Sequence, residues 1–192
     1  MEHLGDRLVT ININKLNFSQ IYLSSEKIEN IEKWFKKSLE NFEPISVRDF
    51  LSNGKLVVTD GHSRTFVAWK NGIVDIPVVY DESEIVTNQI GHEQYINDIL
   101  WCERYKIYHI SDLENRVLPK EMYDELWQNR CEKMYNLVLA LNSKSMNELE
   151  FMKKKSSLEK QKLFIYGISN DLATIYYEDE NGKLYEKKYL EV

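Results

Sequence analysis

The stretch LVVTDGHSRTFVAWKNGIVDIPVV, residues 56–79, decides the fold of this chain. It begins with a short β-branched run that is typical of a buried strand, and Asp60-Gly61 ends that run. The apolar spacing that follows predicts a helix that ends at Gly72. A strand that turns directly into a helix predicts a corner at which the start of the helix is open to a ligand.

The residue types at this corner are those that bind anions. Unpaired N–H groups and the positive end of the helix dipole favour negative charge at the start of a helix. Gly61 allows close approach to the backbone, Ser63 offers a hydroxyl, and Arg64 offers a planar fork suited to phosphate oxygens. We expect His62 to donate to the same group. The alternative interpretation is structural: Asp60 caps the helix, Gly61 makes the turn and Arg64 lies on a solvated face.

The order of elements around this corner resembles the ParB/sulfiredoxin superfamily, and within it the ParB N-terminal-like domain. The resemblance rests on Pro-Ile-Ser-Val at residues 44–47, Asp-Gly-His-Ser-Arg at 60–64, a helix that contains Ala68, and Ile-Pro-Val-Val at 76–79. It covers roughly residues 8–82. The chain is also similar to bacterial ParB-like proteins. The resemblance implies a small mixed α/β (α+β) fold, in which helices cover a ParB/sulfiredoxin-like sheet.

The same resemblance implies that the corner binds a nucleotide triphosphate or diphosphate with Mg²⁺. Asp60 is the implied magnesium contact and, with His62, the implied catalytic residue. The implied activity is phosphoryl transfer or hydrolysis on a small molecule, as in the free serine kinases that share the Asp-Gly-His-X-Arg form. The motif and the helix start together indicate these residues for nucleotide or phosphate binding: Gly61, His62, Ser63, Arg64 and Thr65.

Two departures separate this chain from the known activities of the superfamily. Sulfiredoxins need a cysteine at the position of His62, which argues against their chemistry. The serine kinases place a catalytic glutamate shortly before the first helix, whereas residues 16–20 read Leu-Asn-Phe-Ser-Gln. A kinase would need Glu26 or Glu43 as its base, close to the acceptor hydroxyl. The alternative function is a non-catalytic, nucleotide-sensing or protein-interaction module.

Composition argues against several other classes of protein. The 192 residues carry a net charge of −6 without a basic stripe, which argues against a DNA-partition-type protein. No apolar run is long enough to span a bilayer and the first residues lack a signal-peptide pattern, so we expect a cytoplasmic protein with no membrane partner.

Cys102 and Cys131 lack a CxxC partner and predict reduced, buried thiols. His92, Glu93 and His109 are too few and too far apart to predict a zinc site.

The periodicity of the chain predicts its elements. Strands are expected at residues 8–13, 44–50, 55–59 and 74–80, with a hairpin between the second and third. The apolar stripe of a first helix, capped by Ser24 or Ser25, is predicted to be core and not part of a site. Further helices are expected at residues 91–106, with Tyr95, Ile99 and Leu100 on one face, and from Pro119 onward.

These elements predict four segments. The segments are a ParB/sulfiredoxin-like domain at residues 1–84, a helical extension packed on it at 85–142, a charged linker or exposed helix at 143–160, and a small antiparallel β meander at 161–192. We expect the helical extension or the C-terminal meander to provide a contact for a homodimer or a protein partner.

Overall fold

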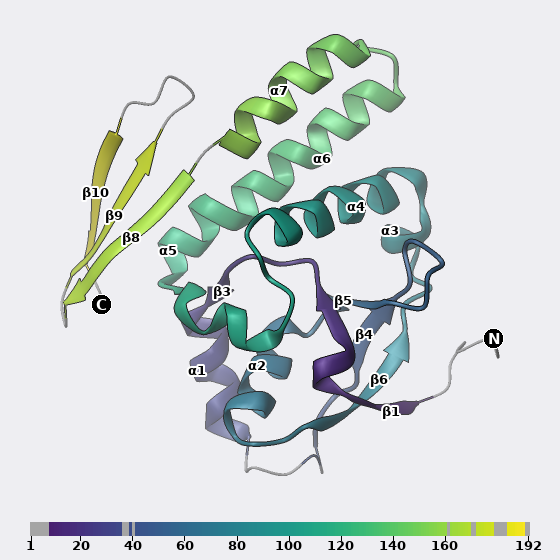
Figure 1. The fold of residues 1–192 in the computed structure, drawn as a ribbon, viewed down its shortest axis with the longest axis vertical. Coiled ribbons are helices and arrows are strands. Elements are labelled where there is room, and N and C mark those ends of the chain that lie inside the picture. Colours follow the sequence, from purple (N-terminus) through teal and green to yellow (C-terminus); the bar gives the residue numbers. More distant parts are fainter. Residues whose placement is uncertain are drawn as a thin grey trace. The chain divides into compact units, whose positions relative to one another are not determined.

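The computed structural model describes residues 8–35, 39, 41–160, 162–169, 172–178 and 184–190. The chain divides into two compact units, and the division falls between Tyr123 and Asp124, within the segment predicted as the helical extension. Helices and strands are mixed along the sequence, which confirms the expected mixed α/β class (Figure 1).

The first unit is built on a five-stranded mixed sheet with the order β1-β6-β4-β5-β2. β4 and β5 form the predicted antiparallel hairpin, and β6 runs parallel to β4 and antiparallel to β1. β2 was not predicted as a strand, and it pairs with β5 as a parallel edge strand. The bounds are β1 Val9–Asn12, β2 Leu16–Phe18, β4 Ile45–Arg48, β5 Leu56–Asp60 and β6 Asp75–Tyr80.

Burial on both faces explains why β5 reads as an unbroken apolar run. Successive side chains of a strand point to opposite faces of the sheet. Val58 is completely buried, while Val57 belongs to a cluster with Phe50 and Val86, against which Tyr95 packs. A strand that is covered on both sides needs no polar alternation. The strand that leads into the corner is therefore held from both faces.

Two helices of the first unit lie side by side next to the corner (Figure 1). They are α1 Ser25–Trp34 and α2 His62–Lys70. Ser24 is the N-cap of α1 and accepts a hydrogen bond from the Lys27 amide, which confirms one of the two predicted caps. α2 ends just before Gly72, whose φ of +78° fits the predicted glycine stop.

The rest of the first unit is mainly helical. The predicted helix at residues 91–106 is present as α4, but Leu100 is 47% exposed, so the prediction that it shares one face with Tyr95 and Ile99 is wrong. Consecutive residues of a helix are about 100° apart, and Leu100 is turned away from the cluster that Ile96 and Ile99 contact. The bounds are α3 Glu84–Thr87, α4 Gln89–Arg104, η2 Ile110–Arg116, α5 Lys120–Tyr123, and the short parallel pair β3 Leu23–Ser24 and β7 Val117–Leu118.

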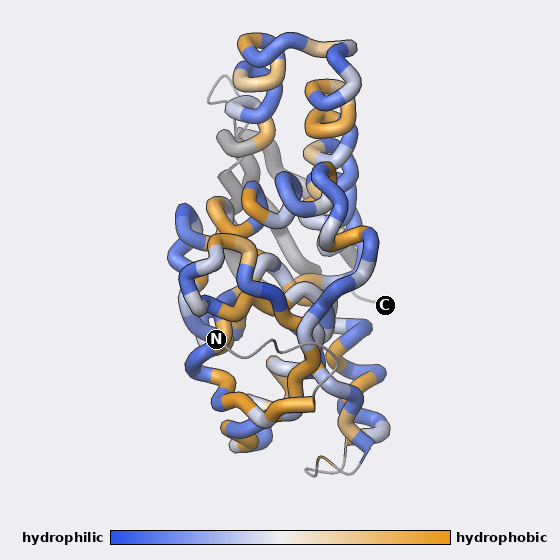
Figure 2. Tube along the Cα trace, turned by 90° about the vertical axis from the view of Figure 1, so that its right-hand side faces the viewer, coloured by the Kyte–Doolittle hydropathy of each residue, from blue (hydrophilic) through white to orange (hydrophobic). Residues whose placement is uncertain are grey.

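The second unit contains a helical pair and a three-stranded antiparallel sheet of order β10-β9-β8. The helix expected to run on from Pro119 is interrupted, because a π-helical segment separates α5 from α6. Of the two alternatives for residues 143–160, the helix is present as α7, which pairs with α6 and carries both hydrophobic and hydrophilic residues (Figure 2). The bounds are η3 Asp124–Gln128, α6 Asn129–Asn142, α7 Glu148–Lys160, β8 Lys162–Ser169, β9 Leu172–Glu178 and β10 Leu184–Leu190.

Candidate anion-binding cleft

Gly61 makes the turn from β5 into α2. Its φ is +96°, in the left-handed region that favours glycine. A Cβ at this position would lie 2.5 Å from Cδ1 of Ile45 and 3.1 Å from Nη2 of Arg64, so no side chain fits here. The corner therefore needs glycine for its backbone conformation and for its close packing.

The amides at the start of α2 are left open. No side chain caps this helix, and the first helical bond runs from the Thr65 amide to the Gly61 carbonyl at 2.8 Å. Within the described ranges, the amides of His62, Ser63 and Arg64 have no hydrogen-bond acceptor. The structural alternative, in which Asp60 caps this helix, is therefore wrong. Three donors and the positive end of the dipole meet at one point, which favours an anion.

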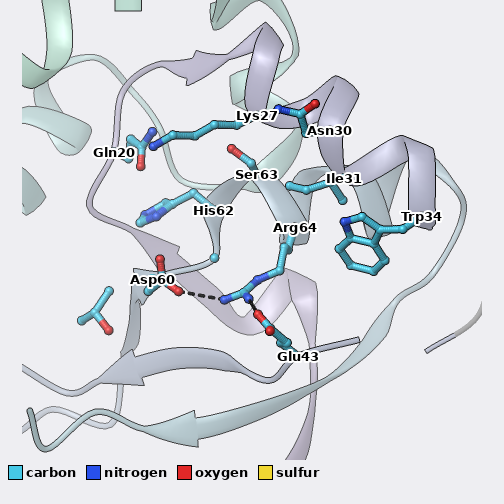
Figure 3. A pocket seen from close by; sticks show the side chains of 12 residues that line it. Gln20, Lys27, Asn30, Ile31, Trp34, Glu43, Asp60, His62, Ser63 and Arg64 are labelled. Atoms are coloured by element: carbon cyan, nitrogen blue, oxygen red, sulfur yellow. Dashed lines mark hydrogen bonds and ion pairs between the residues drawn. The ribbon is translucent and has the colours of Figure 1, made fainter. Parts of the chain in front are cut away.

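The residues at the start of α2 line a cleft of about 480 Å³ (Figure 3). α1 supplies Lys27, Asn30, Ile31 and Trp34 to its lining, so the prediction that the apolar stripe of α1 is core only is wrong. Ile28 is the buried member of that stripe, whereas Trp34 is 41% exposed. The lining residues are Gln20, Lys27, Asn30, Ile31, Trp34, Glu43, Thr59, Asp60, Gly61, His62, Ser63 and Arg64.

Arg64 lies between two carboxylates of its own chain (Figure 3). Its Nη2 donates to Oδ2 of Asp60 at 2.7 Å, and its Nη1 donates to Oε2 of Glu43. The Arg64 side chain is 15% exposed, while those of Asp60 and Glu43 are 75% and 78% exposed. The guanidinium is thus held in place at the edge of the cleft. It is not the solvated surface arginine of the structural alternative.

His62 is buried and uncharged. Burial, together with the nearby positive charge of Lys27, lowers the pKa of His62 to about 3. Its Nε2 lies 3.4 Å from both the amide and the hydroxyl of Ser19, and that hydroxyl donates to the Val58 carbonyl at 2.7 Å. With Nε2 accepting from the Ser19 amide, the ring proton lies on Nδ1. His62 can offer a neutral N–H group to a ligand but no positive charge at neutral pH.

Ser63 and Lys27 complete the polar part of the cleft. Ser63 is 9% exposed and its hydroxyl lines the cleft without a hydrogen-bond partner in the part of the chain that the structure describes. Lys27 places Nζ 5.1 Å above the centroid of the Tyr123 ring, and its side chain extends along the cleft toward Gln20 (Figure 3). The Ser63 hydroxyl, Lys27 and the start of α2 therefore line one space.

The structure separates the candidate residues of the sequence into two groups. Of the two proposed bases, Glu43 lines the cleft and Glu26 does not. Thr65 is completely buried, and its hydroxyl donates to the Gly61 carbonyl at 3.0 Å, so it supports the helix start and does not reach the cleft. The candidates that line the cleft are Glu43, Asp60, Gly61, His62, Ser63 and Arg64.

Several lining residues were missed by the sequence interpretation, and one signal could have found them. Lys27, Ile31 and Trp34 follow one another at spacings of four and three, which places them on one face of a helix. Gln20 was also missed, although it lines the cleft. Its Nε2 donates to the Tyr22 carbonyl at 2.6 Å and to the Tyr123 hydroxyl at 2.9 Å.

The other candidate centres lie elsewhere. No three His, Cys, Asp or Glu side chains come close enough to bind a metal ion anywhere in the described ranges. His92 packs on Phe50, with ring centroids 5.5 Å apart. Cys102 is a buried free thiol whose pKa is raised by burial and by Asp98, and Cys131 is half-buried. Neither thiol lines the cleft.

Comparison with known proteins gives no match: no protein-family model matches the sequence, and no curated protein matches it significantly. Among the described residues, no helix is both long and apolar enough to cross a membrane.

Proposed function

We propose that the cleft binds a phosphorylated nucleotide, with the phosphates at the start of α2. The three open amides of His62, Ser63 and Arg64 carry this proposal. Ser63 adds a buried hydroxyl donor, and Lys27 adds a positive charge on the opposite wall. The resemblance to the ParB/sulfiredoxin superfamily points to the same corner through Asp-Gly-His-Ser-Arg.

The apolar part of the cleft suits the rest of a nucleotide. Ile31 and the partly exposed ring of Trp34 form a wall on α1, and the amide of Asn30 lies beside them (Figure 3). A flat aromatic ring stacks favourably on an indole, and stacking of this kind tolerates different bases. Phosphate donors at one end and an apolar wall at the other match a ligand with an anionic and an aromatic part.

Asp60 and Glu43 are the groups that would hold Mg²⁺. Magnesium bound with a nucleotide uses one or two protein carboxylates together with phosphate oxygens and water, and these two exposed carboxylates beside the open amides fit that requirement. Mg²⁺ would neutralise phosphate charge. Both carboxylates also pair with Arg64, so they have a role without the metal.

In the catalytic form of this proposal, a hydroxyl of a small molecule attacks the terminal phosphorus of the nucleotide. The new oxygen–phosphorus bond forms, the bridging oxygen–phosphorus bond breaks, and the proton of the hydroxyl goes to a carboxylate. Glu43 and Asp60 are the carboxylates among the described residues that line the cleft. His62 is a poor base at neutral pH because its pKa is about 3.

We favour the second form of the proposal, in which the nucleotide is bound without turnover. The position before α1 holds Gln20, whose amide is committed to two hydrogen bonds and cannot take up a proton. Such a protein would act as a nucleotide-sensing module. The two forms differ in product, because only a kinase or hydrolase consumes the bound nucleotide.

A ligand panel tests the proposal. Thermal unfolding is measured with ATP, ADP, CTP and GTP, each with Mg²⁺, for the wild-type chain and for Arg64→Ala. At least one nucleotide should raise the unfolding midpoint of the wild type in a concentration-dependent way, and the rise should be reduced in the variant. No shift at millimolar nucleotide would refute binding. If a nucleotide binds, the release of nucleoside diphosphate or inorganic phosphate over hours would show that it is turned over.

A further inference from the structure

The Arg64 guanidinium, the strongest anion-binding group at the corner, is already paired within the chain. Nη1 donates to Glu43 and Nη2 donates to Asp60. Asp60 ends β5 immediately before the turn and is four residues from Arg64, so it belongs to the same rigid corner. Glu43 comes from the segment before β4, and 78% of its side chain is exposed. Glu43 is therefore the partner that an incoming group can replace.

The charges of the cleft explain why this pairing matters. Among the described lining residues, two cations, Lys27 and Arg64, face two anions, Glu43 and Asp60, and His62 is neutral, so the formal charges of these residues cancel. The Glu43 carboxylate offers Arg64 the same charge-assisted hydrogen bond that a phosphate oxygen would offer. A phosphate bound at the α2 amides can pair with the Arg64 guanidinium only when Glu43 releases it.

We propose that Glu43 is an internal ligand of Arg64 that competes with the bound phosphate and lowers the affinity of the cleft for it. This inference rests on the proposed phosphate-binding function and adds a residue that sets its affinity. Asp60 keeps its contact and orients the guanidinium, while the Glu43 carboxylate leaves as the phosphate enters. Glu43, one of the two candidate bases, thus acts first as a substitute for the ligand.

Removing the Glu43 charge tests this competition. The full chain is titrated calorimetrically with inorganic tripolyphosphate in EDTA, so that no metal contributes. Glu43→Gln should bind it about two- to fivefold more tightly than the wild type, the range expected for loss of an exposed ion pair. Glu29→Gln is the matched control, because it removes an exposed carboxylate of α1 that does not line the cleft. Its affinity should equal that of the wild type.

A double-mutant cycle separates competition for Arg64 from a general effect of charge. The gain from Glu43→Gln should be lost when Arg64 is already alanine, since no guanidinium remains to compete for. An equal gain in affinity in both backgrounds would overturn the inference. It would also be overturned if the wild type binds tripolyphosphate and Glu43→Gln binds it equally or more weakly. Neither of these two outcomes would contradict the proposed phosphate-binding function. Absence of binding by the wild type and by Glu43→Gln would overturn both proposals.

Discussion

At the scale of single residues, Gly61 has the most constrained position of the corner. It combines a positive φ with a backbone that approaches Ile45 and Arg64 more closely than any side chain permits. Because Gly61 is the N-cap residue and has no side chain, the neighbouring amides also lack a side-chain cap. The feature that makes the turn possible is therefore also the feature that exposes the donors to a ligand.

Gly61→Ala should destabilise the protein through two additive effects. The left-handed backbone costs about 1–2 kcal/mol for a residue with a Cβ, and the contact with Ile45 adds about 1–3 kcal/mol of overpacking. Gly54→Ala is the matched control, because Gly54 has a φ of +79° and a Cβ added there would meet nothing within 4 Å. Urea unfolding should show the larger loss for Gly61→Ala. Equal losses would mean that the Ile45 contact relaxes without cost.

His62 should make the stability of the fold depend on pH. Its pKa is about 3 in the folded chain and 6.5 as the ordinary value, so the unfolded chain binds the proton more tightly. The stabilising contribution is complete above pH 6.5 and is lost as the pH falls toward 3. Between pH 6 and 5 this one group should remove roughly 1 kcal/mol of unfolding free energy per pH unit.

Urea unfolding at pH 7, 6 and 5 measures this slope. In His62→Gln, whose amide can replace the contact to Ser19 without titrating, stability should depend less on pH over the same interval. An identical slope in the two proteins would show that the buried imidazole is not the group that takes up the proton.

At the scale of elements, the corner was more predictable than the cleft. The β4–β5 hairpin, the glycine turn and α2 follow from local signals: a β-branched run, Asp60-Gly61 and an apolar helical spacing. β2 has only three residues and gave no such signal. The spacing of Lys27, Ile31 and Trp34 places them on one face of α1, but whether that face lines a cleft depends on how α1 packs against α2, which no local pattern predicts.

The pairing of Arg64 with Glu43 could not be predicted from local sequence either. Asp60, four residues away, was identified by its motif, whereas Glu43, twenty-one residues away, entered only as one of two possible bases. Its contact with Arg64 arises because the segment before β4 is brought next to the end of β5. Sequence reasoning found the residue types of the site and missed which of them are paired.

Gly91 should tolerate alanine poorly, although it lies in a helix. Alanine is normally better than glycine in helices by about 1 kcal/mol. Here an added Cβ would lie 1.7 Å from the carbonyl oxygen of Ile85, so α3 must move away from the first turn of α4. Gly91→Ala should therefore lower the unfolding free energy by roughly 1–3 kcal/mol. A gain in stability in urea unfolding would contradict this packing of α3 on α4.

At the scale of the whole molecule, every described residue that lines the cleft belongs to the first unit. Gln20 and Lys27 both contact Tyr123, which is the last residue of that unit. The described part of the cleft is therefore formed within the first unit. The second unit remains free for another role, for which the predicted contact with a protein partner is one hypothesis.

A fragment of residues 1–123 should therefore retain phosphate binding. Calorimetric titration with tripolyphosphate should give a dissociation constant within about threefold of the full chain, since a compact unit carries its own core. Circular dichroism of the fragment checks that it is folded. A folded fragment that does not bind would mean that the second unit contributes to the site.

An NMR titration that observes the backbone amides of His62, Ser63 and Arg64 tests the anion site most directly. Tripolyphosphate is added to ¹⁵N-labelled protein, and the ¹H–¹⁵N resonances are followed. If a phosphate binds at the start of α2, these three amide protons should show the largest downfield shifts, because they gain acceptors that they lack in the free chain. Saturating shifts confined to other residues, or no shifts at all, would contradict the assignment of this corner as an anion site.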